Sequence, residues 1–234
     1  MIKLYQFPRA MGLINASSFC VKVETYFKMA GLDYEVVEMA DPRKAPKGKL
    51  PYIEDDGVAI ADSTFIIEHC KAKYGDTLNE GMPAQAVTVG HAFKRMLDEN
   101  LYFVILYNRW VDPEFWPDTK EAFQPMFPPV IGGLLLEKLR KDMTKMLNGQ
   151  GIARHSRDEV YAIGNNDLDA VSNFLGDKPF FHGDKPRDTD AYVFGHIVQI
   201  IAAPQETPMK AHATSLPNLV DYCDRMQDRF FADN

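Results

Sequence analysis

Residues 46–70 read PKGKLPYIEDDGVAIADSTFIIEHC and carry most of the information about the fold. The segments LPYIED and GVAIAD have strand patterns, and the turn at Asp55–Gly57 joins them as a hairpin. Asp62 and Ser63 then supply capping side chains for a helix that ends at Gly75. The side chains expected on the buried face of this helix are Ile66, Ile67, Cys70 and Tyr74.

The residues before this stretch predict a strand, a helix and a second strand. Lys3–Phe7 and the segment YEVVEM from Tyr34 have strand patterns. Between them a helix begins at Ser17 or Ser18 and is ended by Gly31. The order β-α-β followed by β-β-α predicts an α/β unit with a small mixed sheet.

From about Ala84 the strand pattern disappears and helical patterns continue to the end of the chain. These patterns cover about residues 85–110, 130–148, 156–175, 189–201 and 217–230. A proline-rich stretch over residues 113–129 predicts a loop. The segment LNEGMPAQ has the composition of a linker. The chain is therefore expected to hold an α/β domain over residues 1–80 and an all-α domain over residues 85–234.

The composition fits a globular protein, with 234 residues, 46% of them hydrophobic, and a net charge of −7. The acidic balance argues against a nucleic-acid partner. No apolar run approaches the roughly 20 residues of a membrane span, and MIKLYQFP has a strand pattern, so neither a membrane partner nor a signal segment is expected. The three cysteines are few and far apart, which indicates a reducing, cytoplasmic compartment, and no residues have metal-ligand spacing, so no metal is expected.

An α/β domain of this order, followed by an all-helical domain, resembles the cytosolic glutathione transferases. Within them it is most similar to the branch related to the failed-axon-connections proteins and the metaxins. The matching pieces are YQFPRA, SSFCVKVETYFKMAGLDYE, PKGKLPYIEDDGVAIADSTFIIEHC and LPNLVDYCDRM. They cover nearly the whole first domain, whereas the helical domain matches more loosely. The resemblance implies a thioredoxin-like domain joined to an all-α domain, with glutathione as cosubstrate and a two-fold homodimer.

The resemblance makes Ser17 the expected catalytic residue. A helix N-terminus presents unpaired N–H groups and a partial positive charge, which lower the pKa of a thiol placed there. A hydroxyl beside that thiol can donate a hydrogen bond to the sulfur. Ser18 is the neighbouring candidate. Related sequences often carry proline at its position, so this chain has a second hydroxyl there, and either one could act on the thiol. The alternative for either serine is a plain helix cap.

By the same resemblance, two further motifs would complete the glutathione site. The residues expected to bind glutathione are Ser18, Lys47, Lys49, Leu50, Pro51, Asp62 and Ser63. Pro51 would follow a cis peptide bond and leave the backbone of Leu50 to pair with the cysteinyl part of glutathione, a form of strand addition. The two lysines would meet the glycine carboxylate. The acid–serine pair would hold the ammonium and carboxylate of the γ-glutamyl end.

The second substrate is expected to be a small hydrophobic electrophile or a peroxide. Tyr102, Arg109 and Trp110 close the long helix that lines the second-substrate pocket in this family, and aromatic rings with one arginine suit a flat or anionic partner. Some transferase classes use a tyrosine on the first strand. Here Gln6 occupies that position, and strand alternation turns Tyr5 to the opposite face, so Tyr5 is expected in the core.

Two other hypotheses stay open. A binding or scaffold protein could keep the fold without turnover, because family membership does not fix chemistry. Cys20 is expected to be a buried core residue, and its alternative is a thiol reductase or peroxidase role. The segment GDKPRDTDAY precedes the helix expected over residues 189–201, where the family usually has a capping box that begins with Ser or Thr. Here Arg187 replaces that residue and Asp190 is retained. Asp188 is expected to take over the cap.

Overall fold

The computed structural model describes residues 1–232, and its first domain is built on a four-stranded sheet. The strands are β1 (Ile2–Gln6), β2 (Tyr34–Glu38), β3 (Tyr52–Asp55) and β4 (Val58–Ala61). They lie in the order β2-β1-β3-β4, with β1 parallel to β2 and the other pairs antiparallel. Leu4 pairs with Val36 on one side and with Ile53 on the other. This mixed sheet confirms the predicted fold class.

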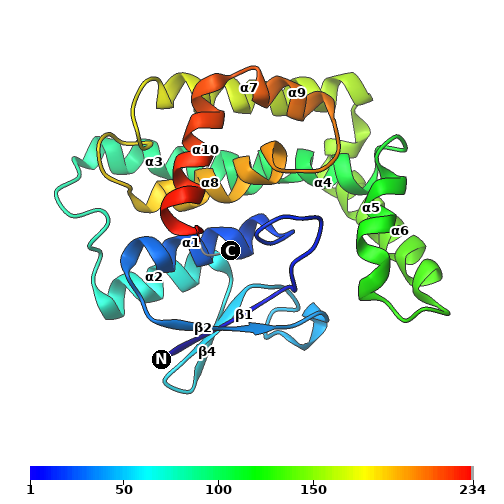
Figure 1. The fold of residues 1–234 in the computed structure, drawn as a ribbon, viewed down its shortest axis with the longest axis horizontal. Coiled ribbons are helices and arrows are strands. Elements are labelled where there is room, and N and C mark those ends of the chain that lie inside the picture. Colours follow the sequence, from blue (N-terminus) through cyan, green and yellow to red (C-terminus); the bar gives the residue numbers. More distant parts are fainter. Residues whose placement is uncertain (233–234) are drawn as a thin grey trace.

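Two helices lie between the sheet and the helical domain, as Figure 1 shows. They are α1 (Ser18–Ala30) and α2 (Ser63–Tyr74). Ser17 and Asp62 cap their N-termini, and Gly31 ends α1 with a positive φ of 65°, which glycine adopts without strain. The predicted ends of both helices are thus confirmed.

Tyr74 does not lie on the buried face of α2 as predicted. It is 42% exposed, and its hydroxyl donates a hydrogen bond to Oδ1 of Asp55 at 2.9 Å. Its ring stays partly exposed at the last turn of the helix, while its hydroxyl is held by the buried carboxylate of Asp55. The apolar spacing therefore predicted the helix correctly but extended the buried face one turn too far.

The described part of the second domain is built from helices and the loops that connect them. Its helices are α3 (Ala84–Met96), α4 (Tyr102–Trp110), α5 (Trp116–Phe123), α6 (Gly132–Gln150), α7 (Arg157–Leu175), α8 (Asp188–Ile201), α9 (Pro208–Thr214) and α10 (Pro217–Phe230). Three short 3-10 helices are also present: η1 (Pro42–Lys44) in the first domain, and η3 (Gln124–Met126) and η4 (Ile152–Arg154) in the second. A π-helical segment, η2 (Leu97–Leu101), connects α3 to α4.

Three features of this domain differ from the prediction. The long helix over residues 85–110 is interrupted by the π-helical segment η2. The proline-rich stretch contains α5, because Pro117 occupies the first turn, where proline favours a helix instead of breaking it. Helix α9, which begins at Pro208 and is capped by Thr207, was not predicted.

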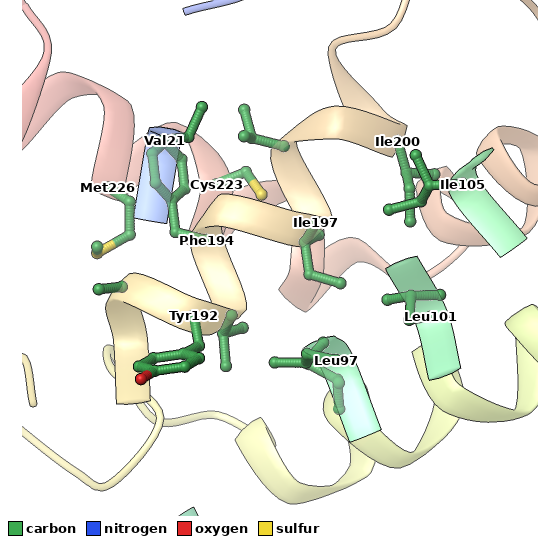
Figure 2. Close-up of a cluster of buried hydrophobic side chains, with 14 of the residues drawn as sticks. Val21, Leu97, Leu101, Ile105, Tyr192, Phe194, Ile197, Ile200, Cys223 and Met226 are labelled. Atoms are coloured by element: carbon green, nitrogen blue, oxygen red, sulfur yellow. The ribbon is translucent and has the colours of Figure 1, made fainter. Parts of the chain in front are cut away.

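Helix α8 forms the centre of the second domain. Every residue of α8 except Ile201 is buried, including the polar side chains of Asp188, Asp190, His196 and Gln199. Figure 2 shows Tyr192 and Ile197 of α8 beside Leu97, with Phe194 on the side of Met226 from α10. Because α1 also packs against α8, the N-terminus of α1 is held against the helical domain.

Gly195 allows the close approach of α1 to α8. A Cβ atom at Gly195 would lie 2.9 Å from the carbonyl oxygen of Ser18 and 3.0 Å from the backbone nitrogen of Lys22. Both contacts are with backbone, which cannot rotate away. We expect Gly195→Ala to lower the free energy of unfolding by about 1–3 kcal/mol, the usual cost of overpacking, as measured by urea denaturation.

Gly149→Ala is the matched control for this prediction. Gly149 lies in α6, and a Cβ atom there would meet no atom of another element within 4 Å. Alanine at this position should stabilise the helix by about 0.5–1 kcal/mol. Equal effects of the two substitutions would contradict the close packing of α1 on α8.

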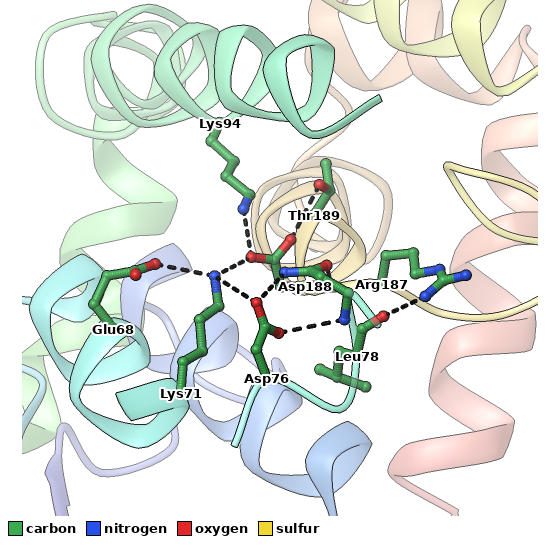
Figure 3. Close-up of polar contacts among 9 residues, drawn as sticks. Glu68, Lys71, Asp76, Leu78, Lys94, Arg187, Asp188 and Thr189 are labelled. Atoms are coloured by element: carbon green, nitrogen blue, oxygen red, sulfur yellow. Dashed lines mark hydrogen bonds and ion pairs between the residues drawn. The ribbon is translucent and has the colours of Figure 1, made fainter. Parts of the chain in front are cut away.

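Asp188 does not take over the helix cap at the start of α8. Its Oδ2 atom lies 2.5 Å from Nζ of Lys71 and 2.6 Å from Nζ of Lys94, so it joins α2 to α3 (Figure 3). Burial alone would raise the pKa of Asp188. The charges and hydrogen bonds of Lys94 and Lys71 outweigh burial and lower this pKa to about 2. Asp190 keeps its half of the capping box, since its Oδ2 atom accepts the N–H of Arg187 at 2.8 Å.

None of the helices within residues 1–232 is both long enough and apolar enough to cross a bilayer.

Candidate active site

The first part of the site is the N-terminus of α1. Ser17 has extended backbone angles, and its Oγ atom accepts the N–H of Cys20 at 3.4 Å. Asn15 fixes the turn before it: Asn15 Oδ1 accepts the N–H of Ser17 at 3.0 Å, and Nδ2 donates to the carbonyl of Phe7 at 2.7 Å. The hydroxyl of Ser17 is therefore held at the helix end, partly exposed, where the positive end of the helix dipole lies.

Ser17 and Ser18 occupy different environments. Ser18 is 2% exposed, and its backbone lies at the contact of α1 with Gly195 in α8. Ser17 stands outside that contact, at the cap. Of the two serines that the sequence left open, Ser17 is therefore the one better placed to meet a ligand.

The second part is the loop before β3. The Leu50–Pro51 peptide bond is cis, as predicted. Within residues 1–232, neither the N–H nor the C=O of Leu50 makes a backbone hydrogen bond. The side chains of Leu50 and Cys20 belong to one small apolar cluster, which brings this unpaired backbone beside the first turn of α1.

The third part is the N-terminus of α2. Asp62 has a φ of 85°, a backbone region that residues other than glycine rarely adopt and that is found most often at functional sites. Its Oδ1 atom accepts the N–H of Thr64 at 2.9 Å and of Phe65 at 3.4 Å. Asp62 is exposed, and Ser63 is buried.

A cavity of about 270 Å³ opens beside the N-terminus of α2. One wall is formed by residues 62–65 and by Phe19 from the first turn of α1. The residues that line it from the helical domain are Arg95, Asp98, Glu99, Tyr102 and Phe103. The cavity therefore lies between the two domains and carries charged groups of both signs.

The two predicted lysines are exposed at the edge of this region. Nζ of Lys47 lies 4.6 Å from the ring centroid of Phe65, a residue that lines the cavity. Lys49 is exposed one residue before Leu50. Their role toward a glycine carboxylate stays a prediction.

The structure separates the three residues assigned to a second-substrate pocket. Tyr102 lines the cavity. Arg109 is buried and donates to the carbonyl of Ala16 at 2.6 Å and to Oε1 of Gln199 at 2.7 Å. Trp110 is buried in a cluster of aromatic rings with Trp116 and Phe123.

Arg109 therefore acts on the site indirectly. Its hydrogen bond to Ala16 holds the residue immediately before Ser17 against the helical domain. Gln199 adds a second link, since its Nε2 atom donates to the carbonyl of Asn15 at 2.8 Å. The sequence carried no signal of this role, because the partners are 90 or more residues apart.

Tyr5 does not lie in the core as expected. It is only half-buried and packs against the small cluster around Cys20, not in the main core. Its ring stacks on Tyr52 with centroids 4.2 Å apart, and its hydroxyl donates to Oε2 of Glu54 at 2.9 Å. That carboxylate and burial raise the pKa of Tyr5 to about 12, so it is a poor proton donor for a thiolate.

Sequence reasoning missed a buried ion pair under the cavity. Nζ of Lys22 lies 2.9 Å from Oδ2 of Asp98, and the two side chains are 0% and 4% exposed. Burial lowers the pKa of Lys22 to about 8, although Asp98 acts in the opposite direction. His196 stands 3.6 Å from the same carboxylate, and burial lowers its pKa to about 4. Lys22 lies between Val21 and Val23 in the predicted helix, and residue spacing gave no sign that it is buried.

Cys20 is fully buried, as the core hypothesis predicted. Burial raises the pKa of its thiol to about 12, more than the backbone of Phe7 and the hydroxyl of Ser17 lower it. The thiolate is the reactive form, so this cysteine is inert at neutral pH.

We expect Cys20→Ala to leave the rate of glutathione conjugation unchanged in a steady-state assay. A loss of activity without a loss of folded protein would restore the thiol reductase hypothesis.

Among residues 1–232, no three His, Cys, Asp or Glu side chains are grouped so that they could hold a metal ion.

The fold and the three-part arrangement define a class of protein: a thioredoxin-like domain with a helical second domain and a cavity at their junction. Comparison with known proteins gives the family. Residues 18–115 match the glutathione S-transferase N-terminal domain, and residues 164–226 match the glutathione S-transferase C-terminal domain. The chain belongs to the glutathione S-transferase family.

Two relatives are each 34% identical to the chain. One is the isoprene-epoxide–glutathione S-transferase of Rhodococcus sp. (strain AD45), matched over 98% of this chain and 99% of the relative. The other is Failed axon connections of Drosophila melanogaster, matched over 100% of this chain and 59% of that protein. Metaxin-1 of Mus musculus is 25% identical over 98% of this chain and 75% of its own length.

A solved structure with a similar fold is a glutathione S-transferase of Ceriporiopsis subvermispora in complex with glutathione. It superimposes with a TM-score of 0.68 at 17% identity and covers 97% of each chain. These relatives confirm the predicted resemblance to the glutathione transferases, and also the predicted resemblance to the failed-axon-connections and metaxin branch.

Proposed function

We propose that this chain is a glutathione transferase that activates the thiol of glutathione with Ser17. The observation that carries the proposal is the position of the unpaired Leu50 backbone beside the capped start of α1. A cysteinyl residue paired with Leu50 would bring its sulfur to this helix end. There the helix dipole and the Ser17 hydroxyl favour the thiolate over the thiol.

The chemistry that follows is a nucleophilic attack by the thiolate on a small electrophile. For an epoxide, the sulfur forms a bond to a ring carbon, the carbon–oxygen bond breaks, and the alkoxide takes a proton from water. The enzyme contributes the lowered thiol pKa and the proximity of the two reactants. The relative from Rhodococcus is named for an epoxide substrate, so epoxides are the first class of electrophile to test.

The other parts of the proposal are a homodimer and Lys47, Lys49, Asp62 and Ser63 as further glutathione ligands, which the resemblance implies, and a cytoplasmic location, which the few and widely spaced cysteines indicate. Peroxide is the second candidate electrophile.

A binding protein without turnover is the second candidate function. It is favoured by the relationship to Failed axon connections and metaxin-1. It is also favoured by exposed apolar side chains at the start of α6, where Val130 is 93% and Leu134 is 76% exposed.

The test is a conjugation assay with glutathione and isoprene epoxide, in which the product is measured by mass spectrometry. We expect conjugate to form faster than in the uncatalysed reaction and the rate to saturate with glutathione. Binding of glutathione without conjugation of epoxides or reduction of peroxides would favour the second candidate.

A further inference from the structure

We propose that Arg109 is a buried cation whose counterion is the thiolate of the bound substrate, so that this arginine of the helical domain favours ionisation of the thiol. The inference rests on the proposed function and adds to it a residue from the second domain. Arg109 is a positioning residue, which acts through the backbone before Ser17 and through its charge.

Arg109 is buried without an acidic partner. Both of its hydrogen bonds go to neutral oxygens, the carbonyl of Ala16 at 2.6 Å and Oε1 of Gln199 at 2.7 Å. Within residues 1–232, no carboxylate acts on its charge. Burial lowers the pKa of Arg109 to about 10, so the guanidinium stays charged at neutral pH. A buried charge is costly unless an opposite charge compensates it, so this cation calls for a counterion.

Buried positive charge is compensated elsewhere in the fold. Lys22, the other buried lysine or arginine of the described chain, has its Nζ atom 2.9 Å from Oδ2 of Asp98. The half-buried Lys71 and Lys94 share Asp188, at 2.5 Å and 2.6 Å. The missing counterion of Arg109 is therefore a departure from the rest of the fold, and a ligand is the remaining source of negative charge.

The position of Arg109 brings its charge to the Ser17 site. The carbonyl oxygen of Ala16 is two bonds from the backbone nitrogen of Ser17, so the guanidinium nitrogen that donates to it lies within about 5 Å of that nitrogen. The charge also acts on the cavity wall, since it lowers the pKa of Tyr102 against the larger effect of burial. An anion at the start of α1 would meet this charge in addition to the helix dipole.

The ionisable groups around Arg109 and the start of α1 do not supply this charge. Burial raises the pKa values of Tyr102 and Cys20 to about 12 and lowers that of His196 to about 4, so all three are neutral at neutral pH. The buried ion pair one turn further along α1 is compensated internally. Asp62, at the start of α2, is exposed, and water and salt screen its charge. Arg109 therefore dominates the field at this helix end.

The test measures the pKa of the glutathione thiol bound to the full chain, by the difference absorbance of the thiolate across a pH titration. Arg109→Gln removes the charge and should raise this pKa by about one unit, the usual size of the effect of a nearby opposite charge. The bound glutathione would then hold about tenfold less thiolate at neutral pH. Arg109→Lys keeps the charge and should retain most of the wild-type effect.

A second pair of variants tests the charge while Arg109 stays in place. Gln199→Glu puts a carboxylate where Oε1 of Gln199 lies 2.7 Å from the guanidinium, and it should also raise the thiol pKa by about one unit. Gln199→Met loses the same hydrogen bond to the carbonyl of Asn15 without adding a charge. The difference between these two variants reports the charge alone, and it decides the question if Arg109→Gln does not fold.

Arg187→Gln is the matched control. Arg187 also joins the helical domain to backbone carbonyls, those of Leu78 at 2.7 Å and Glu80 at 2.9 Å, but in the segment after α2. This variant should leave the thiol pKa unchanged. A wild-type thiol pKa in Arg109→Gln, or equal thiol pKa values in Gln199→Glu and Gln199→Met, overturns this inference and leaves the proposed function standing. Failure of the wild-type protein to bind glutathione overturns the proposed function itself.

Discussion

Ser17→Ala is expected to lower kcat/KM for glutathione conjugation by about 100-fold, the usual effect of removing one hydrogen-bond donor to a developing or stabilised anion. The donor lost is the hydroxyl at the start of α1, whose Oγ also accepts the N–H of Cys20. The pKa of the bound glutathione thiol should rise. The rate should therefore recover partly at high pH, as followed by initial rates and by thiolate absorbance between neutral and alkaline pH.

Two control variants separate catalysis from helix capping. Ser17→Asp keeps a capping acceptor for α1 but has no proton to donate at neutral pH. It should fold as stably as the wild-type protein and lose activity like Ser17→Ala. Ser18→Ala tests the neighbouring hydroxyl and should change the thiol pKa much less. Full activity of Ser17→Ala together with loss in Ser18→Ala would move the catalytic role to Ser18.

Asp98→Ala is expected to lower the free energy of unfolding by about 3–5 kcal/mol at pH 7, because it leaves the buried Lys22 ammonium without its counterion. The loss of Asp98 should lower the pKa of Lys22 below its present value of about 8. Between these two pKa values the wild-type protein holds a proton that the folded variant has released. The stability deficit should therefore shrink as the pH rises through this interval to about 8.

Urea denaturation at several pH values measures this deficit. The double variant Lys22→Met/Asp98→Leu is the control, since an apolar pair of similar volume often replaces a buried ion pair at little cost. It should be markedly more stable than Asp98→Ala. A deficit of Asp98→Ala below about 1 kcal/mol, the range of an exposed ion pair, would show that the pair is hydrated in solution.

Much of the first domain could be predicted because its signals are local. Strand alternation, the turn at Asp55–Gly57 and the capping residues Ser17 and Asp62 each act within a few residues. The same local rules failed where one residue type serves two purposes. Pro117 was expected to break structure, although it begins α5. The π-helical segment η2 has no distinct spacing in the sequence, so the pattern predicts ordinary helix there.

The candidate active site likewise has parts that could be predicted from the sequence and parts that could not. The helix starts at Ser17 and Asp62 follow from local capping motifs, and the cis bond before Pro51 was implied by the family resemblance. The contacts that support them join distant parts of the chain. Lys22 and Asp98 are 76 residues apart, and Arg109 and Ala16 are 93 apart. Periodicity placed Arg109 on a helix but could not show that the helix turns it toward the Ser17 loop.

The decisive measurement for the Ser17 thiol site is a calorimetric titration of glutathione into the wild-type protein, with thiolate absorbance followed in parallel. We predict saturable binding with one glutathione per chain and a thiolate signal at neutral pH, which disappears in Ser17→Ala. No binding at millimolar glutathione would contradict the assignment and would mean that this chain keeps the transferase fold without the thiol site.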